Sequence, residues 1–546
     1  FVLLLFCVAR SVNTMSEKNP NAEGANTDVT DASEGPLAAS EPSVAWIVED
    51  DVGNWLAGRE ARYATAMSEN AKTEKENPQK APFESKYAAR EIFAELLAEV
   101  EARLAEKKDQ PKATEYLEGV AGFLLLQLGN NFIESEETSE GERHLGRAKK
   151  YLEPLKLNPR FCGSYIQGLS SEGILWANRS DHQKSHLLLQ EAVSAYQSFL
   201  QFCKGKDPRP TPGLTSTLLP SGTIKQCWHE FESAHTHSLF YLAQCYGHLG
   251  QPAKSAEYCV ITLQRQLIYK TYDPLDWAIN AAGISQYYLA VPDFETASHC
   301  LLCASAIAEE GGTDTEVQQE QHANIARCWI KYLLNLLSVS LDYRAEKAVQ
   351  GELPDSNLQF ELDADRIGTA PKTLAKTPAQ AQAIFNLGEK YCTDALKFYT
   401  LEGHVTDYVA VEQDRSQFYR HLCEYVSDPD HKCKLHKRRV DMLTIAVKEL
   451  NPQYFLAICR QLYFELAEIT AEMMSLKRSR FTDSNRPDDK AIAKMNRLTL
   501  DSIKWFTEFV DSCRENNTKA IPETLDETVV RPFLVAQFTM ARLHSK

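Results

Sequence analysis

The stretch LFYLAQCYGHLGQPAKSAEYCVIT, residues 239–262, decides the fold of this chain. It places two helix-forming segments on either side of a turn at Gly250. In the first segment the small residue Ala243 precedes the aromatic Tyr246 by three positions, and the second segment carries the small residue Ser255. Two antiparallel helices that cross closely need small residues at the crossing. The stretch therefore predicts a helical hairpin with its two helices in close contact.

The same rhythm of small, aromatic and small residues occurs four times along the chain, as it does in tetratricopeptide units. The matching sets are Gly129, Phe132, Gly141, Leu145 and Ala148; Gly173, Trp176, Ser185, Leu189 and Ala192; Ala243, Tyr246, Ser255, Cys259 and Thr262; and Ser285, Tyr288, Ala297, Leu301 and Ala304. Their spacing exceeds the 34 residues of a standard unit, which indicates longer helices or inserted loops. The repeats predict an all-α, tetratricopeptide-like α-solenoid.

The composition agrees with a helical protein and limits its partners. Alternating Val, Ile and Thr runs, which are typical of half-buried strands, are almost absent. The formal net charge is -16, and no basic footprint dominates, so we expect no nucleic-acid partner. An acidic surface suits a basic protein partner. Acidity also serves solubility alone, and the charge leaves both interpretations open.

The 14 cysteines lie mostly inside apolar helical segments. Free cysteine in such a place is a small buried hydrophobe, so we expect reduced thiols in a cytoplasmic protein. The apolar segment at residues 1–9 is too short to span a bilayer, and we expect no membrane insertion. Met15 precedes a polar stretch that resembles an ordinary N-terminus, so residues 1–14 are interpreted as a translation or expression artefact.

Composition and proline positions divide the chain into five predicted segments. They are a disordered N-terminus at 1–42, an N-terminal tetratricopeptide-like subdomain at 43–310, a long helix at 316–347, a flexible loop at 348–377 and a C-terminal helical subdomain at 378–546. The chain stops inside what resembles the first helix of another repeat. Because a solenoid needs a capping element at its end, we expect this C-terminal subdomain to be truncated.

A search for reactive constellations finds none that predicts an enzyme. Cys300 and Cys303 form a CxxC pair, but no second pair completes a zinc site. His182 and His186 are four residues apart without a carboxylate or cysteine partner in the pattern. Phosphate-binding loops and the GxSxG elbow are absent from the sequence. We therefore expect a non-enzymatic protein without cofactor, metal or small-molecule substrate.

The first helix of each tetratricopeptide pair lines the concave groove, so its exposed face is the candidate binding surface. The predicted partner-binding residues are Tyr241, Gln244, His248, Gly283 and Gln286 on that face, with Gln266, Trp277 and Asn280 beside it at turns or helix ends. Mixed polar and aromatic groups suit a protein interface. Tyr241 is alternatively a packing residue between repeats, and the sequence leaves both roles open.

One basic cluster stands out in this acidic chain: Lys432, Lys434, His436, Lys437, Arg438 and Arg439. Such clusters are read as nuclear-import or nucleic-acid signals, or as a solvated helix face. We favour the solvated face. A third interpretation is that Lys434, Lys437 and Arg438 contact an acidic patch on the partner protein.

Long segments of this chain resemble one protein family. The segments include Tyr241-Leu242-Ala243-Gln244, Leu263-Gln264-Arg265-Gln266-Leu267, Trp277-Ala278-Ile279-Asn280-Ala281-Ala282, Ile325-Ala326-Arg327-Cys328-Trp329-Ile330-Lys331-Tyr332, Cys433-Lys434-Leu435-His436-Lys437-Arg438-Arg439 and Asn451-Pro452-Gln453-Tyr454. In these strings the chain resembles the kinesin-binding protein family (KIF-binding proteins). The resemblance runs from about Trp46 to the end of the chain.

The resemblance implies a right-handed α-solenoid of two subdomains joined by a long linker helix, here residues 316–347. It implies binding to kinesin motor domains, which blocks their attachment to microtubules and thereby controls axonal and mitochondrial transport and microtubule organisation in neurite outgrowth. Tyr241, Gln244 and Gln266 match the implied contact region. Gly283 stands where relatives carry a hydroxyl group, so a polar contact is not expected there.

The sequence alone also permits a tetratricopeptide scaffold or a co-chaperone adaptor. A co-chaperone that clamps an acidic C-terminal peptide needs Lys and Asn at fixed groove positions. The first two repeats instead offer Leu126 and Asn130, then Ser170 and Ile174, so the clamp is not expected here.

Overall fold

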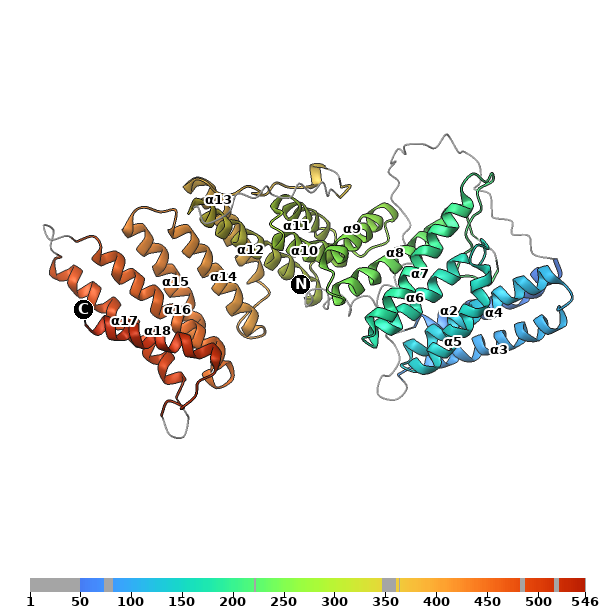
Figure 1. Ribbon diagram of the computed structural model, residues 1–546, viewed down its shortest axis with the longest axis horizontal. Helices are drawn as coiled ribbons and strands as arrows, with labels where there is room; N and C mark the ends of the chain where they lie inside the picture. Colours follow the sequence, from blue (N-terminus) through green and yellow to red (C-terminus); the bar gives the residue numbers. More distant parts are fainter. Residues whose placement is uncertain are drawn as a thin grey trace. The chain divides into compact units, whose positions relative to one another are not determined.

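The computed structural model describes residues 50–72, 82–219, 222–345, 360–362, 364–481, 487–514 and 520–545. Within these ranges the chain forms seventeen α-helices and two short 3-10 helices, without a β-strand (Figure 1). The prediction of an all-α solenoid of helical hairpins is confirmed. The predicted disordered N-terminus and residues 348–359 of the predicted loop lie outside the described residues.

The helices mostly pack against the next one in the sequence. They are α2 (Asp50–Asn70), α3 (Glu84–Glu106), α4 (Pro111–Glu134), α5 (Thr138–Leu152), η2 (Glu153–Leu155), α6 (Cys162–Asn178), α7 (His182–Cys203), α8 (Ile224–His248), α9 (Pro252–Tyr269), α10 (Pro274–Ala290), α11 (Phe294–Ala308), α12 (Glu316–Arg344), η3 (Ala364–Arg366), α13 (Pro378–Ala395), α14 (Val405–Cys423), α15 (Pro429–Glu449), α16 (Pro452–Arg478), α17 (Asp489–Ser512) and α18 (Glu527–His544). The chain forms two compact units, and their boundary falls between Asp276 and Trp277, inside α10.

Helix starts are encoded locally. Helices α8, α12 and α13 each begin with a capping box in which the hydroxyl of Thr223, Thr315 or Thr377 accepts a bond from the third helical amide. In each box the side-chain oxygen of a glutamine at that third position accepts a hydrogen bond from the backbone amide of the threonine. Two otherwise unpaired donors are thereby satisfied at each start.

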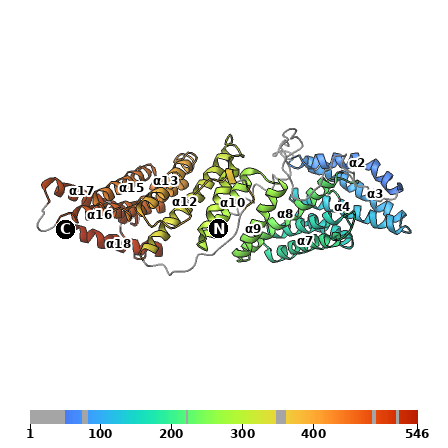
Figure 2. The same cartoon turned by 90° about the horizontal axis from the view of Figure 1, so that it is seen from above.

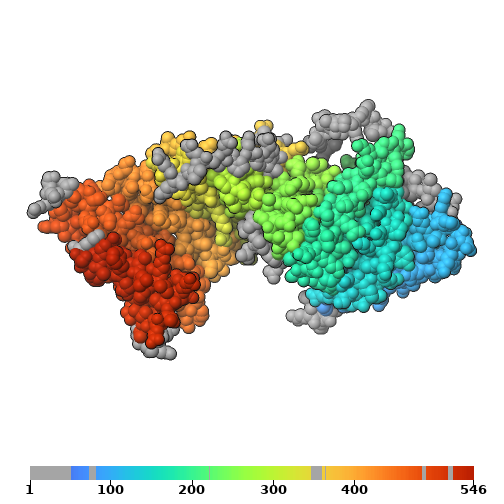
Figure 3. Space-filling model, in the orientation of Figure 1, coloured from blue at the N-terminus to red at the C-terminus, as the bar shows by residue number. Residues whose placement is uncertain are grey.

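Small residues sit where the paired helices cross. A methyl group added at Gly129 would lie 2.7 Å from Leu145 Cδ2, and one added at Gly173 would lie 2.9 Å from Leu189 Cγ. The small residues of the later repeats, Ala243 and Ser255 among them, are fully buried. The repeat pattern therefore marks the helix crossings. Figure 3 shows the side chains that cover one face of these helices.

We expect Gly129→Ala to lower the free energy of unfolding by about 1–3 kcal/mol, because the added methyl group overpacks the crossing of α4 and α5. Gly146→Ala on α5 is the matched control, because its added methyl group meets open space. That change should be neutral or stabilise the chain by up to about 1 kcal/mol through helix propensity. Thermal unfolding followed by circular dichroism measures both; equal effects would contradict the crossing assignment.

Each unit has its own core. In the first unit a core runs from α2 to α8 around fully buried rings that include Tyr63, Phe93, Phe123, Phe161 and Phe199. In the second unit a core joins α14 to α18 around Leu462, Leu466 and Phe506. Helix α12 packs against α11, α13 and α14, so the predicted linker helix is an internal element of the second unit. The observed unit boundary thus differs from the predicted division near residue 350.

The described part of the predicted flexible loop is anchored on α11 and α12 (Figure 1, Figure 2). The backbone amide of Phe360 donates to His299 Nε2 at 2.9 Å, and the Tyr332 hydroxyl donates to the Pro371 carbonyl at 2.6 Å. Farther along, the Ala375 amide donates to Ser340 Oγ at 2.8 Å. These hydrogen bonds help to hold the segment against the helices, which sequence composition does not reveal.

Candidate partner-binding surface

Three of the predicted contact residues share one face of α8. Tyr241, Gln244 and His248 are separated by three and four residues, a spacing that aligns side chains along a helix. Tyr241 and Gln244 are half-buried and His248 is exposed. Leu242, Ala243 and other neighbours between them are buried in the core. Helix α8 therefore presents a polar and aromatic strip on a rigid, well-packed support.

Tyr241 combines both of the roles that the sequence left open. Its ring packs edge-on against His237 and Phe240, with centroids 5.0 and 5.3 Å apart, and against the buried cluster around Leu189 and Leu242. Burial raises the pKa of the Tyr241 phenol, so the hydroxyl stays protonated at neutral pH. Among the described residues that hydroxyl has no hydrogen-bond partner. The ring is fixed by packing while the hydroxyl remains available to a partner protein.

Gln244 and Gln266 present half-buried amide groups from two different helices. Neither side-chain amide has a hydrogen-bond partner within the described part of the chain. Next to Gln266 on α9, Arg265 donates to Thr236 Oγ1 at 3.0 Å and to Glu232 Oε2 at 2.5 Å. Gln266 therefore lies level with the first half of α8, whereas Gln244 lies in the second half. The two amides lie on the two helices of one hairpin.

His248 closes the strip at the end of α8. Its ring stacks in parallel on that of His182, with centroids 4.0 Å apart. Burial lowers the pKa of His182, and the nearby His248 lowers it further. This stack joins the end of α8 to the start of α7.

The predicted residues of α10 have different environments. Trp277 is only 1% exposed and packs edge-on against Phe360 at 5.3 Å, so it is not a surface contact, contrary to our prediction. The physical reason is that Phe360, distant in sequence, covers it. Asn280 and Gln286 are half-buried, and Gln286 Nε2 donates to Ser285 Oγ at 3.0 Å. Gly283 faces open space where a side chain would stand.

The predicted surface is shared between the two units. Tyr241, Gln244, His248 and Gln266 belong to the first unit, whereas Trp277, Asn280, Gly283 and Gln286 belong to the second. The α8–α9 hairpin is therefore the part of the candidate surface that one rigid element supports.

The basic cluster divides into exposed and buried members. Lys434, Lys437 and Arg438 are exposed on α15, whereas His436 and Arg439 are 1% and 3% exposed. Arg439 donates to Ser416 Oγ at 2.9 Å and to Glu465 Oε1 at 3.1 Å. Exposure of the three side chains suits a solvated face and equally a contact with a partner protein, while Arg439 connects α15 to α14 and α16.

The side chains that sequence motifs suggested for chemistry are held in structural roles. Cys303 Sγ lies 3.5 Å from His299 Nε2, but that nitrogen accepts the Phe360 amide. Burial raises the pKa of Cys303 to about 12 and also raises that of Cys300, so neither thiol is readily ionised. Within the described ranges no three His, Cys, Asp or Glu side chains form a metal-binding group. None of the described helices is long and apolar enough to cross a membrane.

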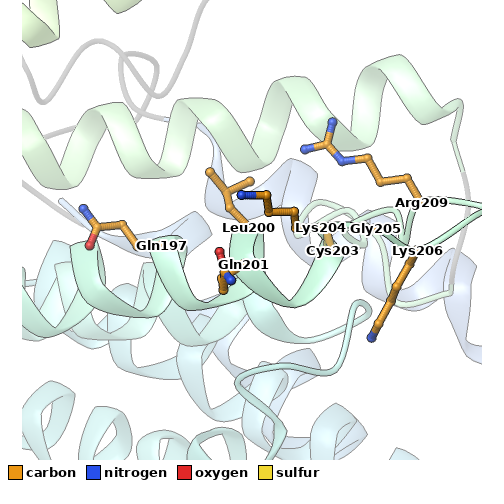
Figure 4. A pocket seen from close by; sticks show the side chains of 8 residues that line it. All are labelled: Gln197, Leu200, Gln201, Cys203, Lys204, Gly205, Lys206 and Arg209. Atoms are coloured by element: carbon orange, nitrogen blue, oxygen red, sulfur yellow. The ribbon is translucent and has the colours of Figure 1, made fainter.

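A hollow of about 490 Å³ lies at the end of α7 (Figure 4). Two of its three cations are held on separate rings: Lys206 rests on the Phe202 ring at 2.9 Å and Arg209 on the Trp228 ring at 3.9 Å. Figure 4 shows these two side chains extending in different directions. Two cations held on separate rings do not form a common anion site.

Comparison with known proteins identifies the family. Residues 275–546 match the family model described as KIF-1 binding protein C terminal. The chain is 36% identical to the KIF-binding protein of Gallus gallus over 537 residues, which cover 90% of this chain and 88% of the relative. The chain belongs to the KIF-binding protein family. The human KIF-binding protein is 32% identical over 535 residues, covering 86% of this chain and 85% of the relative.

A solved structure described as a cryo-EM map of KIFBP matches with a TM-score of 0.58 and 27% identity, covering 90% of this chain and 88% of that one. The resemblance drawn from the sequence strings is thus confirmed. Not all of those strings are surface features: in the segment from Ile325 to Tyr332, most side chains are buried against neighbouring helices. The family strings therefore include residues that pack in the core.

Proposed function

We propose that this protein binds the motor domains of kinesins and blocks their attachment to microtubules. Membership of the KIF-binding protein family is the observation that carries the proposal. Acting at the cytoskeleton in the cytoplasm, the protein would control axonal and mitochondrial transport and microtubule organisation. It does so as a binding regulator, without catalysis, cofactor or small-molecule substrate.

The charge of the chain gives this inhibition a physical basis. A kinesin docks a basic surface on the acidic microtubule, and an acidic protein that covers that surface competes with the track. A net charge of -16 speeds the encounter with a basic motor surface. A small number of buried contacts then sets the residence time of the complex. The Tyr241 hydroxyl and the amides of Gln244 and Gln266 are the groups we assign to this second task.

The co-chaperone alternative receives no support from the groove positions that it needs. Leu126 is fully buried, and Ser170 is buried with its hydroxyl bonded to Ser238 Oγ at 2.7 Å. Neither side chain is available to clamp a peptide carboxylate.

The proposal predicts that the purified chain retains a kinesin motor domain on an affinity resin and suppresses its landing on microtubules. Landing events of a labelled motor domain, counted by fluorescence microscopy, should fall to background at saturating protein. Raising the salt concentration should slow the association step, because screening weakens the attraction of opposite charges. Retention on the resin with undiminished landing would support binding and contradict the blocking mechanism; absence of both would overturn the proposal.

A further inference from the structure

A small basic pocket lies between the end of α16 and the start of α17. Its lining residues are Lys477, Arg480, Phe481, Lys490, Ala491 and Lys494. Four of these six residues are cations and none is acidic. The pocket volume is about 210 Å³, compared with roughly 30 Å³ for a water molecule in the liquid. A carboxylate or phosphoryl group therefore fits within it.

Two of the cations that line the pocket are already paired with a carboxylate outside its lining. Asp430, at the start of α15, forms ion pairs with Lys477 and with Arg480, the latter at 2.7 Å. The hydrogen bond from Lys477 holds the pKa of the Asp430 carboxyl below its usual value. Both cations thus bond the oxygens of Asp430, as guanidinium and ammonium groups bond oxyanions strongly.

The other side of the pocket carries cations without a counterpart. Lys490 and Lys494 are exposed and lie one turn apart on α17. Among the described residues no carboxylate lies within ion-pair distance of either ammonium group. Like charges at this spacing destabilise a helix. Lys490 also lies in the first turn of α17, where the helix dipole favours an anion. An anion placed in the pocket relieves both effects.

We propose that this pocket docks an acidic peptide segment of a partner protein, with one carboxylate or phosphoryl group between Lys477, Arg480, Lys490 and Lys494. The concentration of four cations around one small hollow, in a chain of net charge -16, carries the inference. The site lies on α16 and α17 and is independent of the motor-binding surface proposed on α8 and α9.

The surroundings favour a peptide over a nucleic acid or a membrane. Asp430, Asp488 and Asp489 flank the cations, and these carboxylates would repel a continuous row of phosphates. A hollow of this size accepts one group, whereas a duplex or a lipid surface needs an extended basic face. A peptide can place a single acidic side chain in the pocket and lead its remaining chain away.

The test uses fluorescence anisotropy with the full chain and labelled serine-rich peptides that carry one glutamate, one phosphoserine or neither acidic group. Tighter binding of one acidic peptide than of the peptide without an acidic group identifies the carboxylate or the phosphoryl group as the ligand. Lys490→Glu with Lys494→Glu should weaken the binding of that probe by about tenfold or more. Lys490→Gln with Lys494→Gln is the milder second variant, and circular dichroism checks that each variant is folded.

The matched control is Lys397→Glu with Lys504→Glu, which makes the same change in net charge at two exposed lysines outside the pocket. Unchanged peptide affinity in this control supports the pocket. Equal loss in both charge-reversal variants would show attraction by net charge alone and overturn the proposal. Absence of peptide binding at low salt would also overturn the proposal. So would a result in which the pocket variant keeps its peptide affinity but loses binding to an RNA oligonucleotide or to phosphatidylserine vesicles.

Discussion

Replacing Tyr241 with Phe and Gln244 with Ala together is expected to weaken binding of a kinesin motor domain by about 30-fold. Each change removes one polar group that lacks a partner inside the described chain. An interface hydrogen bond contributes about 1 kcal/mol, so the pair contributes about 2 kcal/mol to the binding free energy. The Tyr241→Phe change keeps the ring that packs against His237 and Phe240. Isothermal titration with a purified motor domain measures the loss.

The matched control is Tyr258→Phe with Gln197→Ala. Tyr258 packs against the same buried cluster as Tyr241, and Gln197 is an exposed residue of α7. Affinity should be unchanged in this variant, and both double variants should unfold at nearly the wild-type temperature. If the Tyr241 and Gln244 variant binds the motor normally, the α8 strip is not the contact surface. A large drop in its melting temperature would instead show that these groups stabilise the fold.

The helical repeats could be predicted from the sequence because their determinants are local. The small residues at helix crossings and the threonine caps lie within one hairpin of the residues that they serve. Gly129 and Leu145, for example, predict the crossing of one helix pair without knowledge of the remaining chain. For the same reason the three-residue spacing of Tyr241 and Gln244 predicts that they share one face of a helix.

The environment of Trp277 could not be predicted in this way. Its burial depends on Phe360, which belongs to a segment after α12 and reaches Trp277 only through the fold. A proline-containing polar stretch gave no sign that its described part would be anchored by His299, Tyr332 and Ser340. Contacts between distant segments are set by how the helices pack, and the pattern of a single segment does not predict them.

Arg438 and Arg439 show the same limit within one motif. Both belong to a basic string, yet one side chain is exposed and the other is buried between helices. The helical period places neighbours about 100° apart, so adjacent residues face different surroundings. Only the positions of Ser416 on α14 and Glu465 on α16 decide which arginine becomes internal.

Arg439→Ala is expected to lower the free energy of unfolding by about 3–5 kcal/mol, because it leaves the Glu465 carboxylate without its buried counter-charge. Burial lowers the pKa of the Arg439 guanidinium, and Glu465 opposes that shift by favouring the charged form. The Ser416 hydroxyl donates to the same Glu465 oxygen at 2.6 Å and accepts from Arg439 Nε. Removing the guanidinium therefore disrupts one network that joins α14, α15 and α16. Urea denaturation followed by circular dichroism measures the effect.

Arg438→Ala is the control on the adjacent residue, and its effect should stay within about 0.5 kcal/mol because the side chain is exposed. The double change Arg439→Met with Glu465→Leu should recover much of the lost stability, since it removes both charges and fills their volume. The two changes are then strongly non-additive, as coupled partners require. If the double variant were as unstable as the sum of its single changes, Arg439 and Glu465 would act separately, and the stability of α15 would come from packing alone.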